Sequence, residues 1–353
     1  MCTIRTLQRC NRLAAALRRV VLDFSRKRCC VNWQNTGGKV RLDDHAGEWP
    51  SLCVPRRSLM SDGASLLRSW TMALLNFADV RGYRALDAQA CRVAGSALTE
   101  RYASASPFPH IAIDDFVPRE ILRDVLTDFP ARREQTAFDR HQERLKYQFS
   151  PQQCGSAVIR NLFSELNSAA FLGFLQELTG IDGLIADPYF AGAGLHETMP
   201  GGHLGIHADF NRHRAMNLER RLNLLIYLND DWEDGYGGAL ELWDNRMTAC
   251  EQRIAPILGR AVIFNTDLDS YHGHPDPLAC PVGRSRRSIA TYYYTVPRNA
   301  DFGIERETQF RVRPVSDDRR DWKMILHHVM QDWTPPALRK GRRGALLPRL
   351  LSR

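Results

Sequence analysis

The chain has 353 residues, 44% of them hydrophobic, and a formal net charge of +8 that comes almost entirely from arginine. This length allows one large domain or two smaller ones with a real hydrophobic core. No apolar run reaches the length of a membrane span, so we expect a soluble protein with no membrane partner. The excess arginine gathers in the first sixty residues and in the tail after Arg339, where no aromatic residues interleave with the charges. We therefore expect solvated terminal segments, and a nucleic-acid partner is not favoured.

Nine cysteines are scattered along the chain without a CxxC pair or a regular spacing. This pattern favours reduced thiols and a cytoplasmic protein. Residues 1–30 lack the continuous apolar core of a secretory signal, although their arginine-rich, acid-poor composition leaves an organellar transit peptide as the alternative. The oligomeric state stays open.

Residues 1–105 are predicted to be an N-terminal extension, partly helical and partly disordered. Helical apolar spacing covers 7–24 and 66–77, and the polar segment 32–62 between them is typical of a loop. Nothing in this region suggests chemistry. An internal start at Met60 or Met72 and a native helical extension are both compatible with it.

A domain is predicted from 106 to 300. It opens with Pro107-Phe-Pro-His-Ile-Ala-Ile-Asp-Asp-Phe, which alternates as a strand does. Helical apolar faces follow at 119–129 and at 162–178, the second closed by Gly180. The polar segment 132–157 between them is predicted to be a loop over a site.

From 183 onward, short apolar strands alternate with turns rich in Gly, Asn and Asp. The candidate strands are 183–191, 195–199, 203–209, 222–228, 239–243, 248–254, 261–265, 270–274 and 287–295. They predict a double-stranded β-helix, the cupin-like jelly roll, and the preceding helices make the fold class α+β. Residues 301–353 are predicted to form a C-terminal helix, at 322–330, and a basic tail.

The first chemistry-bearing pair lies in Pro200-Gly-Gly-His-Leu-Gly-Ile-His-Ala-Asp-Phe. His207 and Asp209 are two residues apart, so on an extended strand both side chains leave the same face. A helical interpretation would pair His203 with His207 as zinc proteases do, but the intervening Glu is missing and the glycines disfavour a helix. An imidazole beside a carboxylate, with a further histidine from a distant strand, is typical of the facial triad of non-haem Fe(II) oxygenases.

That further histidine is expected from Ser270-Tyr-His-Gly-His-Pro, where His272 and His274 both qualify by spacing and would face the same side. The spacing alone does not decide between His272 and His274.

A cationic anchor is expected at the start of the last apolar strand. A guanidinium suits a carboxylate because its fork makes two parallel hydrogen bonds. Arg286 stands there on the face that Ser288 shares, whereas Arg287 falls on the other face and Arg284 lies further back in the turn.

Taken together, the run from Pro107 to Tyr294 resembles the iron and 2-oxoglutarate dependent dioxygenases, in particular the prolyl 4-hydroxylase alpha-subunit-like branch. The resemblance includes Leu224-Leu-Ile-Tyr-Leu-Asn-Asp-Asp-Trp and Tyr236-Gly-Gly-Ala-Leu-Glu-Leu-Trp, besides the motifs quoted above. It implies Fe(II) held by His207, Asp209 and His272, with Arg286 on the distal carboxylate of 2-oxoglutarate. His272 is preferred because an apolar residue usually stands two positions after the family's ligand, where His274 stands here.

The same resemblance implies an enzyme that hydroxylates an aliphatic carbon while 2-oxoglutarate becomes succinate and CO2, with L-ascorbate as a possible reductant. A prolyl residue, a free amino acid and another small molecule are all compatible substrates. Asn223 and Tyr227 are expected near the pocket. The alternatives are an inactive cupin-like module that binds a metal or ligand, and an inactive interaction protein whose basic termini hold an acidic partner.

Overall fold

The computed structural model describes residues 73–132, 137–267, 269–297, 306–316 and 318, all of which fall in the compact unit Arg68–Arg353. The helices predicted at 7–24 and 322–330 lie outside the described residues, as does most of the one at 66–77. Among the described residues, no helix is long and apolar enough to cross a membrane.

A hairpin and two short helices precede the predicted domain: β1 (Phe77–Val80), β2 (Tyr83–Leu86), α2 (Ala88–Ser96) and α3 (Thr99–Ala103). Asp87 caps α2 by accepting a hydrogen bond from the Ala90 amide. Leu86, Cys91 and Tyr102 are buried in the main hydrophobic core. The residues just before 106 therefore pack into the same core as those that follow.

The helices that follow are α4 (Arg119–Thr127), α5 (Ala157–Leu166) and α6 (Ala169–Thr179). The prediction of a single helix at 162–178 was wrong, because α5 ends at Leu166 and α6 begins at Ala169. The Ser168 hydroxyl accepts a hydrogen bond from the Phe171 amide and so starts a new helix. Gly180, in the left-handed region with φ of 67°, ends α6 as predicted.

The predicted loop at 132–157 is also corrected by the structure. It contains β4 (Phe138–Arg140), β5 (Glu143–Phe149) and a short 3-10 helix, η2 (Pro151–Gln153). β5 pairs with the strand that carries His207. Most side chains of β5 are polar, so the alternation of apolar residues that predicted the other strands is missing here.

The remaining strands are antiparallel, and most lie within the predicted segments. They are β3 (His110–Ile113), β6 (Ile185–Ala186), β7 (Gly194–Ala208), β8 (Arg212–His213), β9 (Leu218–Tyr227), β10 (Leu240–Trp243), β11 (Cys250–Ile254), β12 (Ala261–Asn265), β13 (His272–His274), β14 (Arg286–Thr295) and β15 (Gln309–Phe310), with a 3-10 helix η3 (Asp234–Tyr236) before β10. The segments predicted at 195–199 and 203–209 form one strand, only residues 185–186 of the segment predicted at 183–191 are a strand, and the strands at 212–213 and 309–310 were not predicted. The main path of hydrogen-bonded strands runs β11-β10-β13-β7-β14-β9-β12-β3.

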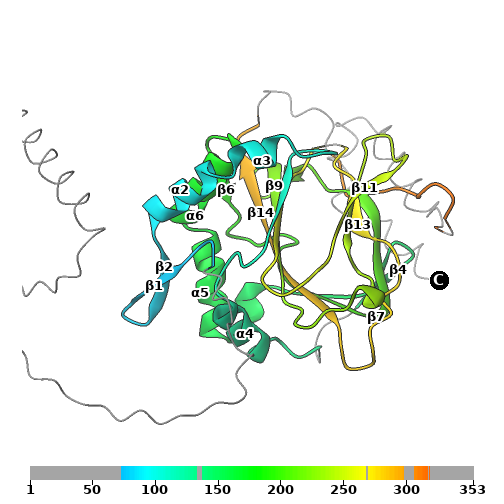
Figure 1. The fold of residues 1–353 in the computed structure, drawn as a ribbon, viewed down its shortest axis with the longest axis horizontal. Coiled ribbons are helices and arrows are strands. Elements are labelled where there is room, and N and C mark those ends of the chain that lie inside the picture. Colours follow the sequence, from blue (N-terminus) through cyan, green and yellow to red (C-terminus); the bar gives the residue numbers. More distant parts are fainter. Residues whose placement is uncertain (1–72, 133–136, 268, 298–305, 317, 319–353) are drawn as a thin grey trace, which may run out of the picture. The chain divides into compact units, whose positions relative to one another are not determined.

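Strand β7 changes partners along its length. Its first part pairs with β14 and its second part with β13 and β15, whereas β5 pairs with both parts, from Leu195 to Leu204. Gly202 lies between the two parts, where an added Cβ would stand 2.7 Å from the Arg144 carbonyl oxygen, so only glycine fits this close approach. The strands thus form one large antiparallel sheet that curls into a nearly closed barrel, which confirms the predicted α+β fold with a double-stranded β-helix (Figure 1).

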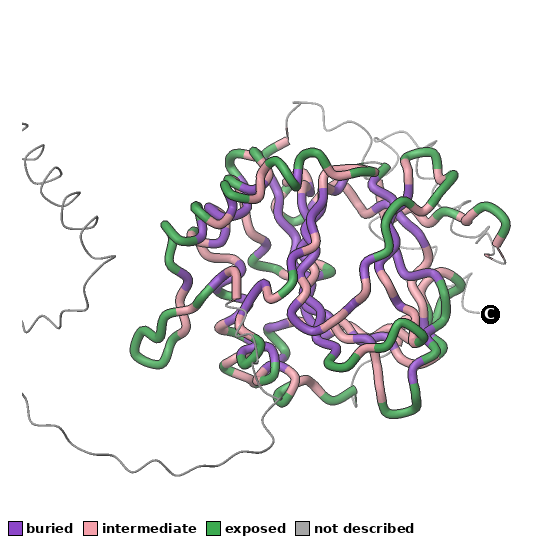
Figure 2. The backbone as a smooth tube through the Cα atoms, in the orientation of Figure 1, coloured by how far each residue is buried: buried purple, intermediate pink, exposed green. Residues whose placement is uncertain are grey.

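The part of the sheet that contains β9 and β14 separates two environments. Leu222, Leu224 and Ile226 of β9 pack into the main core together with the helices, which lie on one side of the barrel in Figure 1. Tyr227 packs instead with Leu240 and other residues inside the barrel. Figure 2 shows buried backbone along the sheet. The helices therefore support one face, and the other face is left for a cavity.

Candidate active site

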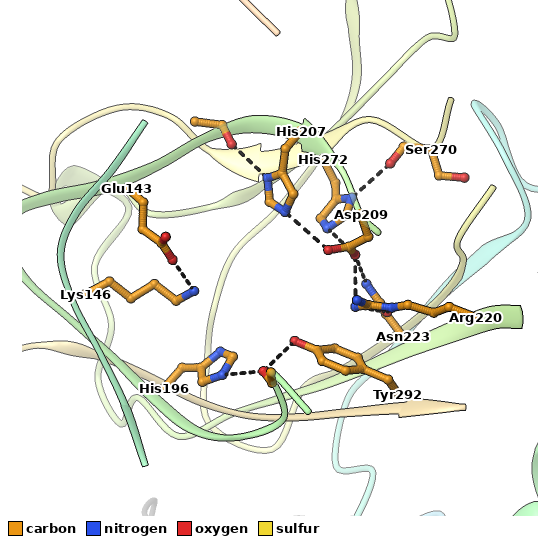
Figure 3. Close-up of polar contacts among 12 residues, drawn as sticks. Glu143, Lys146, His196, His207, Asp209, Arg220, Asn223, Ser270, His272 and Tyr292 are labelled. Atoms are coloured by element: carbon orange, nitrogen blue, oxygen red, sulfur yellow. Dashed lines mark hydrogen bonds and ion pairs between the residues drawn. The ribbon is translucent and has the colours of Figure 1, made fainter. Parts of the chain in front are cut away.

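Two adjacent strands bring the predicted cluster together. His207 of β7 and His272 of β13 are directly paired across the two strands, and their ring centroids are 4.5 Å apart. Asp209 follows β7, with Oδ1 3.7 Å from His207 Nε2 and Oδ2 3.4 Å from His272 Nε2. One possible ligand atom from each residue lies within 4.8 Å of the others, a grouping found nowhere else among the described residues (Figure 3). His274 is not part of this group.

The orientation of both imidazoles leaves the same ring nitrogen open. His207 Nδ1 lies 2.9 Å from the Gly205 carbonyl oxygen, and His272 Nδ1 lies 2.9 Å from the Ser270 carbonyl oxygen. A carbonyl oxygen only accepts, so Nδ1 must carry the proton in each ring. Both Nε2 atoms therefore present a lone pair toward Asp209, as histidines that bind metals do.

Asp209 is held from the side opposite the histidines. The Asn223 side-chain amide donates to Asp209 Oδ2 at 2.7 Å, and a guanidinium nitrogen of Arg220 lies 3.0 Å from the same oxygen. Arg220 also donates to Asn223 Oδ1 and stacks with its Cζ 3.6 Å from the Tyr292 ring centroid. These contacts fix the carboxylate and leave Oδ1 directed toward His207. Asn223, expected near the pocket, thus supports Asp209.

Arg220 was not predicted as a site residue, because the predicted strand at 222–228 begins after it, whereas β9 begins at Leu218. Simple alternation would also place it on the wrong face. On β9, Leu222 and Leu224 face the helices, so Arg220 would be expected to do the same. The register with β14 shifts between Tyr293 and Tyr294, so that Tyr294 pairs with Arg220 and Arg221 is passed over. This bulge turns Arg220 into the barrel.

The protonation states suit a metal site. Burial lowers the pKa of both imidazoles below the ordinary 6.5, that of His272 to about 4. Burial opposes ionisation of Asp209, but the positive charge of Arg220, the two imidazoles and the Asn223 hydrogen bond together hold its pKa below the usual range. At neutral pH the cluster is therefore two neutral imidazoles and one carboxylate.

These shifts predict acid instability of the metal-free protein. A histidine whose pKa is depressed by folding binds its proton more readily when unfolded, so stability falls as the pH drops from 6.5 toward 4. Each such proton contributes a slope of about 1.4 kcal/mol per pH unit within that window. Urea unfolding of metal-free protein at several pH values would measure the slope, and His272→Gln should reduce it. An unchanged slope in His272→Gln would contradict the assignment.

Arg286 lines the cavity that contains the cluster. It is 6% exposed, donates from Nε to the Gly238 carbonyl oxygen at 2.7 Å, and lies 3.4 Å from the Tyr227 hydroxyl. Among the residues that the structure describes, no carboxylate forms an ion pair with it, and burial lowers the pKa of its guanidinium. A buried cation without an acidic partner is costly unless a ligand supplies the negative charge.

The two competing arginines point elsewhere. Arg284 donates to the backbone carbonyl oxygens of Asp230 and Asp231 at the surface. Arg287 pairs with Glu197, outside the cavity. His274 lines the cavity but stays apart from the cluster, and its buried Nδ1 has no hydrogen-bond partner among the described residues.

The cavity has a volume of about 710 Å³, which is within the range of small-molecule sites. Residues 306–310, here called the strap, contribute Arg306, Glu307, Thr308 and Phe310 to its lining. The ring of strap residue Phe310 is tilted against that of His207, with the ring centroids 5.2 Å apart, and Glu307 forms an ion pair of 2.8 Å with Arg214. The site therefore lies in a cavity inside the barrel.

Residues 193–294, which contain His207, Asp209, His272 and Arg286, match the family model of the 2OG-Fe(II) oxygenase superfamily. This segment has the sequence pattern of a 2OG-Fe(II) oxygenase domain. The match confirms the predicted resemblance and the expected class of enzyme, a 2-oxoglutarate-dependent oxygenase, and the family implies Fe(II) and 2-oxoglutarate. A search of curated proteins finds no match.

Solved structures similar to this chain include two prolyl hydroxylases. A Pseudomonas putida prolyl-4-hydroxylase is 18% identical with a TM-score of 0.42, over 57% of this chain and 98% of its own. A prolyl hydroxylase from Trichoplax adhaerens, in complex with a hypoxia inducible factor peptide fragment, is 18% identical with a TM-score of 0.44, over 58% and 91%. HygX from Streptomyces hygroscopicus, with nickel and 2-oxoglutarate bound, is 12% identical with a TM-score of 0.38, over 57% and 92%. These identities are too low to indicate a substrate.

Proposed function

We propose that the oxygenase domain hydroxylates an aliphatic carbon of its substrate, with Fe(II) bound by His207, Asp209 and His272. The observation that carries this proposal is the convergence of two Nε2 lone pairs and one carboxylate oxygen at a single point inside the barrel. Two imidazoles and one carboxylate, with room left beside them, are the donor set of non-haem Fe(II) oxygenases.

The chain's own residues prepare this site before any ligand enters. The Gly205 and Ser270 carbonyls fix the histidine tautomers, and Asn223 with Arg220 fixes the carboxylate. Preorganised ligands keep the coordination geometry open on one side. When bound, Fe(II) supplies the oxidative chemistry, in which dioxygen is consumed and 2-oxoglutarate becomes succinate and CO2.

Arg286 is proposed to bind the distal carboxylate of 2-oxoglutarate. Its Nε already donates to Gly238, and its remaining donors face a cavity that offers no protein carboxylate to it among the described residues. The Tyr227 hydroxyl, which accepts from Arg286, can donate its own proton to the same carboxylate. A planar fork with a neighbouring hydroxyl selects a carboxylate at this end of the cavity.

L-ascorbate as a reductant and a cytoplasmic location remain proposals. The described cysteines, Cys91, Cys154, Cys250 and Cys280, are free thiols, which is compatible with a reducing compartment.

The proposed function is tested by incubating the full chain with Fe(II), 2-oxoglutarate and dioxygen and measuring succinate. We expect succinate that depends on all three additions and rises with a suitable substrate. Absence of succinate from protein shown to bind Fe(II) would favour the inactive cupin-like module.

A further prediction concerns Asn223, which holds the carboxylate without adding charge. Asn223→Ala is expected to weaken Fe(II) or Co(II) binding by about 10- to 100-fold, because Asp209 loses a hydrogen bond that orients it. An anaerobic metal titration measures this effect. Asn76→Ala, at an exposed surface amide, is the control and should bind metal as the wild type does. Equal affinity in both variants would show that Asn223 does not position the ligand.

A further inference from the structure

A second pair of charged residues faces the cluster from another wall of the cavity. Glu143 and Lys146 of β5 form an ion pair of 2.8 Å, and their side chains are only 15% and 13% exposed. Both line the cavity together with His207. In Figure 3 the Lys146 ammonium points toward the space between His207, Asp209 and His196. The triad and the co-substrate anchor make no use of this pair.

The backbone of β5 is distorted in a way that produces the pair. Residues three apart on a regular strand face opposite sides, so Glu143 and Lys146 should point away from each other. The register with β7 shifts between Arg144 and Lys146, and Leu145 adopts a φ of 49°, in the left-handed region. A branched side chain is rarely found there, and such strain and bulges concentrate at functional sites, where they redirect a side chain. Here the bulge brings both charges to the cavity face.

The pair is not explained by a contribution to folding. Removing two charges from water costs about as much as their attraction returns, so a nearly buried ion pair is weak evidence for stability. Lys146 has three donors, of which one binds Glu143 Oε1, and the second carboxylate oxygen of Glu143 is not used in this ion pair. Among the described residues neither side chain makes a further hydrogen bond, so the remaining donors and acceptor can serve a molecule in the cavity.

The strap favours a small molecule over a protein segment. It forms part of the cavity wall, because its residues line the cavity and β15 pairs with Ala208 and His207 of β7. Its Glu307 is joined to Arg214 by an ion pair, and the Arg306 amide donates to Asn211 Oδ1 at 2.9 Å. A polypeptide that entered between the strap and β7 would have to displace these contacts.

We propose that the substrate is a free α-amino acid or a close zwitterionic analogue, with its carboxylate on Lys146 and its ammonium on Glu143. This inference rests on the proposed function and adds to it the substrate class. The ammonium and carboxylate of an α-amino acid are separated by roughly the length of one hydrogen bond, as are Lys146 Nζ and Glu143 Oε1. An antiparallel match places each charge against its opposite, in the same cavity that the triad lines.

The test begins with the twenty proteinogenic L-amino acids and with Fe(II) and 2-oxoglutarate bound to the full chain. Binding is measured by calorimetry without dioxygen, and turnover by succinate formation with dioxygen. For the amino acid that binds best, three analogues are compared: the decarboxylated amine, the acid that lacks the amino group, and the N-acetyl amide. We expect each analogue to bind about 10- to 100-fold more weakly, since each leaves a charged group of the cavity unmatched.

The variants assign each substrate group to one residue. In Lys146→Met the preference for the amino acid over the amine should disappear, while the preference over the acid without the amino group remains. In Glu143→Gln the opposite selectivity is expected. Arg144→Met is the matched control, because Arg144 is an exposed cation on the same strand, paired at the surface with Asp139, and lies outside the cavity lining. It should keep both preferences.

A charge swap distinguishes a loss of binding from a loss of the fold. Glu143→Lys combined with Lys146→Glu keeps an ion pair on the same wall, and a circular dichroism spectrum like that of the wild type would show that it folds. We expect it to lose tight binding of the amino acid or to oxidise it at a different carbon, because the zwitterion would have to reverse.

The outcomes separate this inference from the proposed function. No Fe(II)-dependent succinate under any condition would refute both. Fe(II)-dependent succinate that no amino acid raises, with no amino acid binding, would overturn the zwitterion proposal alone. Stimulation by a proline-containing peptide and not by free amino acids would overturn it as well, and would point to a peptidyl substrate.

Discussion

Asp209→Ala and His207→Ala are expected to lose Fe(II) binding and to reduce succinate formation by at least about 100-fold. Groups that only orient a metal ligand are worth about 10- to 100-fold in affinity or activity, so deletion of a ligand itself should cost more. Asp209 supplies the only carboxylate in the cluster, and without it the two neutral imidazoles cannot balance the charge of the metal. Anaerobic metal titration and a succinate assay measure the two effects separately.

The matched control for these variants is His203→Ala. His203 lies on the same strand as His207, but its Nε2 bonds to the His141 carbonyl oxygen and it does not line the cavity. This variant should retain metal binding and turnover. If Asp209→Ala also kept both, the cluster would not be the iron site.

Arg286→Ala is expected to raise the KM for 2-oxoglutarate while metal binding persists. Truncation of one partner of a buried charge pair costs about 2 to 5 kcal/mol, which corresponds to a rise of about 30-fold or more. Arg286→Lys should restore part of the affinity, because an ammonium keeps the charge and loses the planar fork. The measurement is succinate formation against 2-oxoglutarate concentration, with an Fe(II) titration of each variant.

Arg284→Ala serves as the control for Arg286. This variant removes one arginine charge, as Arg286→Ala does, but the Arg284 side chain donates to carbonyl oxygens at the surface. Its KM for 2-oxoglutarate should match that of the wild type. An equal rise in both variants would indicate a general effect of charge and would remove the special role of Arg286.

Much of the barrel could be predicted from the sequence because its strands obey a simple period. The segment 261–265 was expected as a strand and is β12 with those bounds. Alternation also placed Arg286 and Arg287 on opposite faces, and in the structure one lines the cavity whereas the other pairs with Glu197. Alternation predicts the face of a residue correctly where the register is regular, since each step along the strand reverses the face.

The parts that could not be predicted lie where that period is interrupted. A bulge at Arg221 turns Arg220 inward against Asp209, and the shift at Leu145 brings Glu143 and Lys146 to one face. A single inserted residue reverses the face assigned to every later residue of the strand, and the type of the inserted residue does not indicate the insertion. The hairpin of β4 and β5 was missed for a related reason, because its inward face is polar where it lines the cavity.

The most direct test of the account asks whether the cluster and Arg286 form one site. Calorimetry without dioxygen would follow binding of 2-oxoglutarate to the full chain before and after Fe(II) is added. We predict that Fe(II) strengthens binding of 2-oxoglutarate in the wild type, that Asp209→Ala loses this enhancement, and that Arg286→Ala binds Fe(II) but takes up 2-oxoglutarate weakly. Binding of 2-oxoglutarate that is the same with and without Fe(II), or that persists unchanged in Arg286→Ala, would contradict the account.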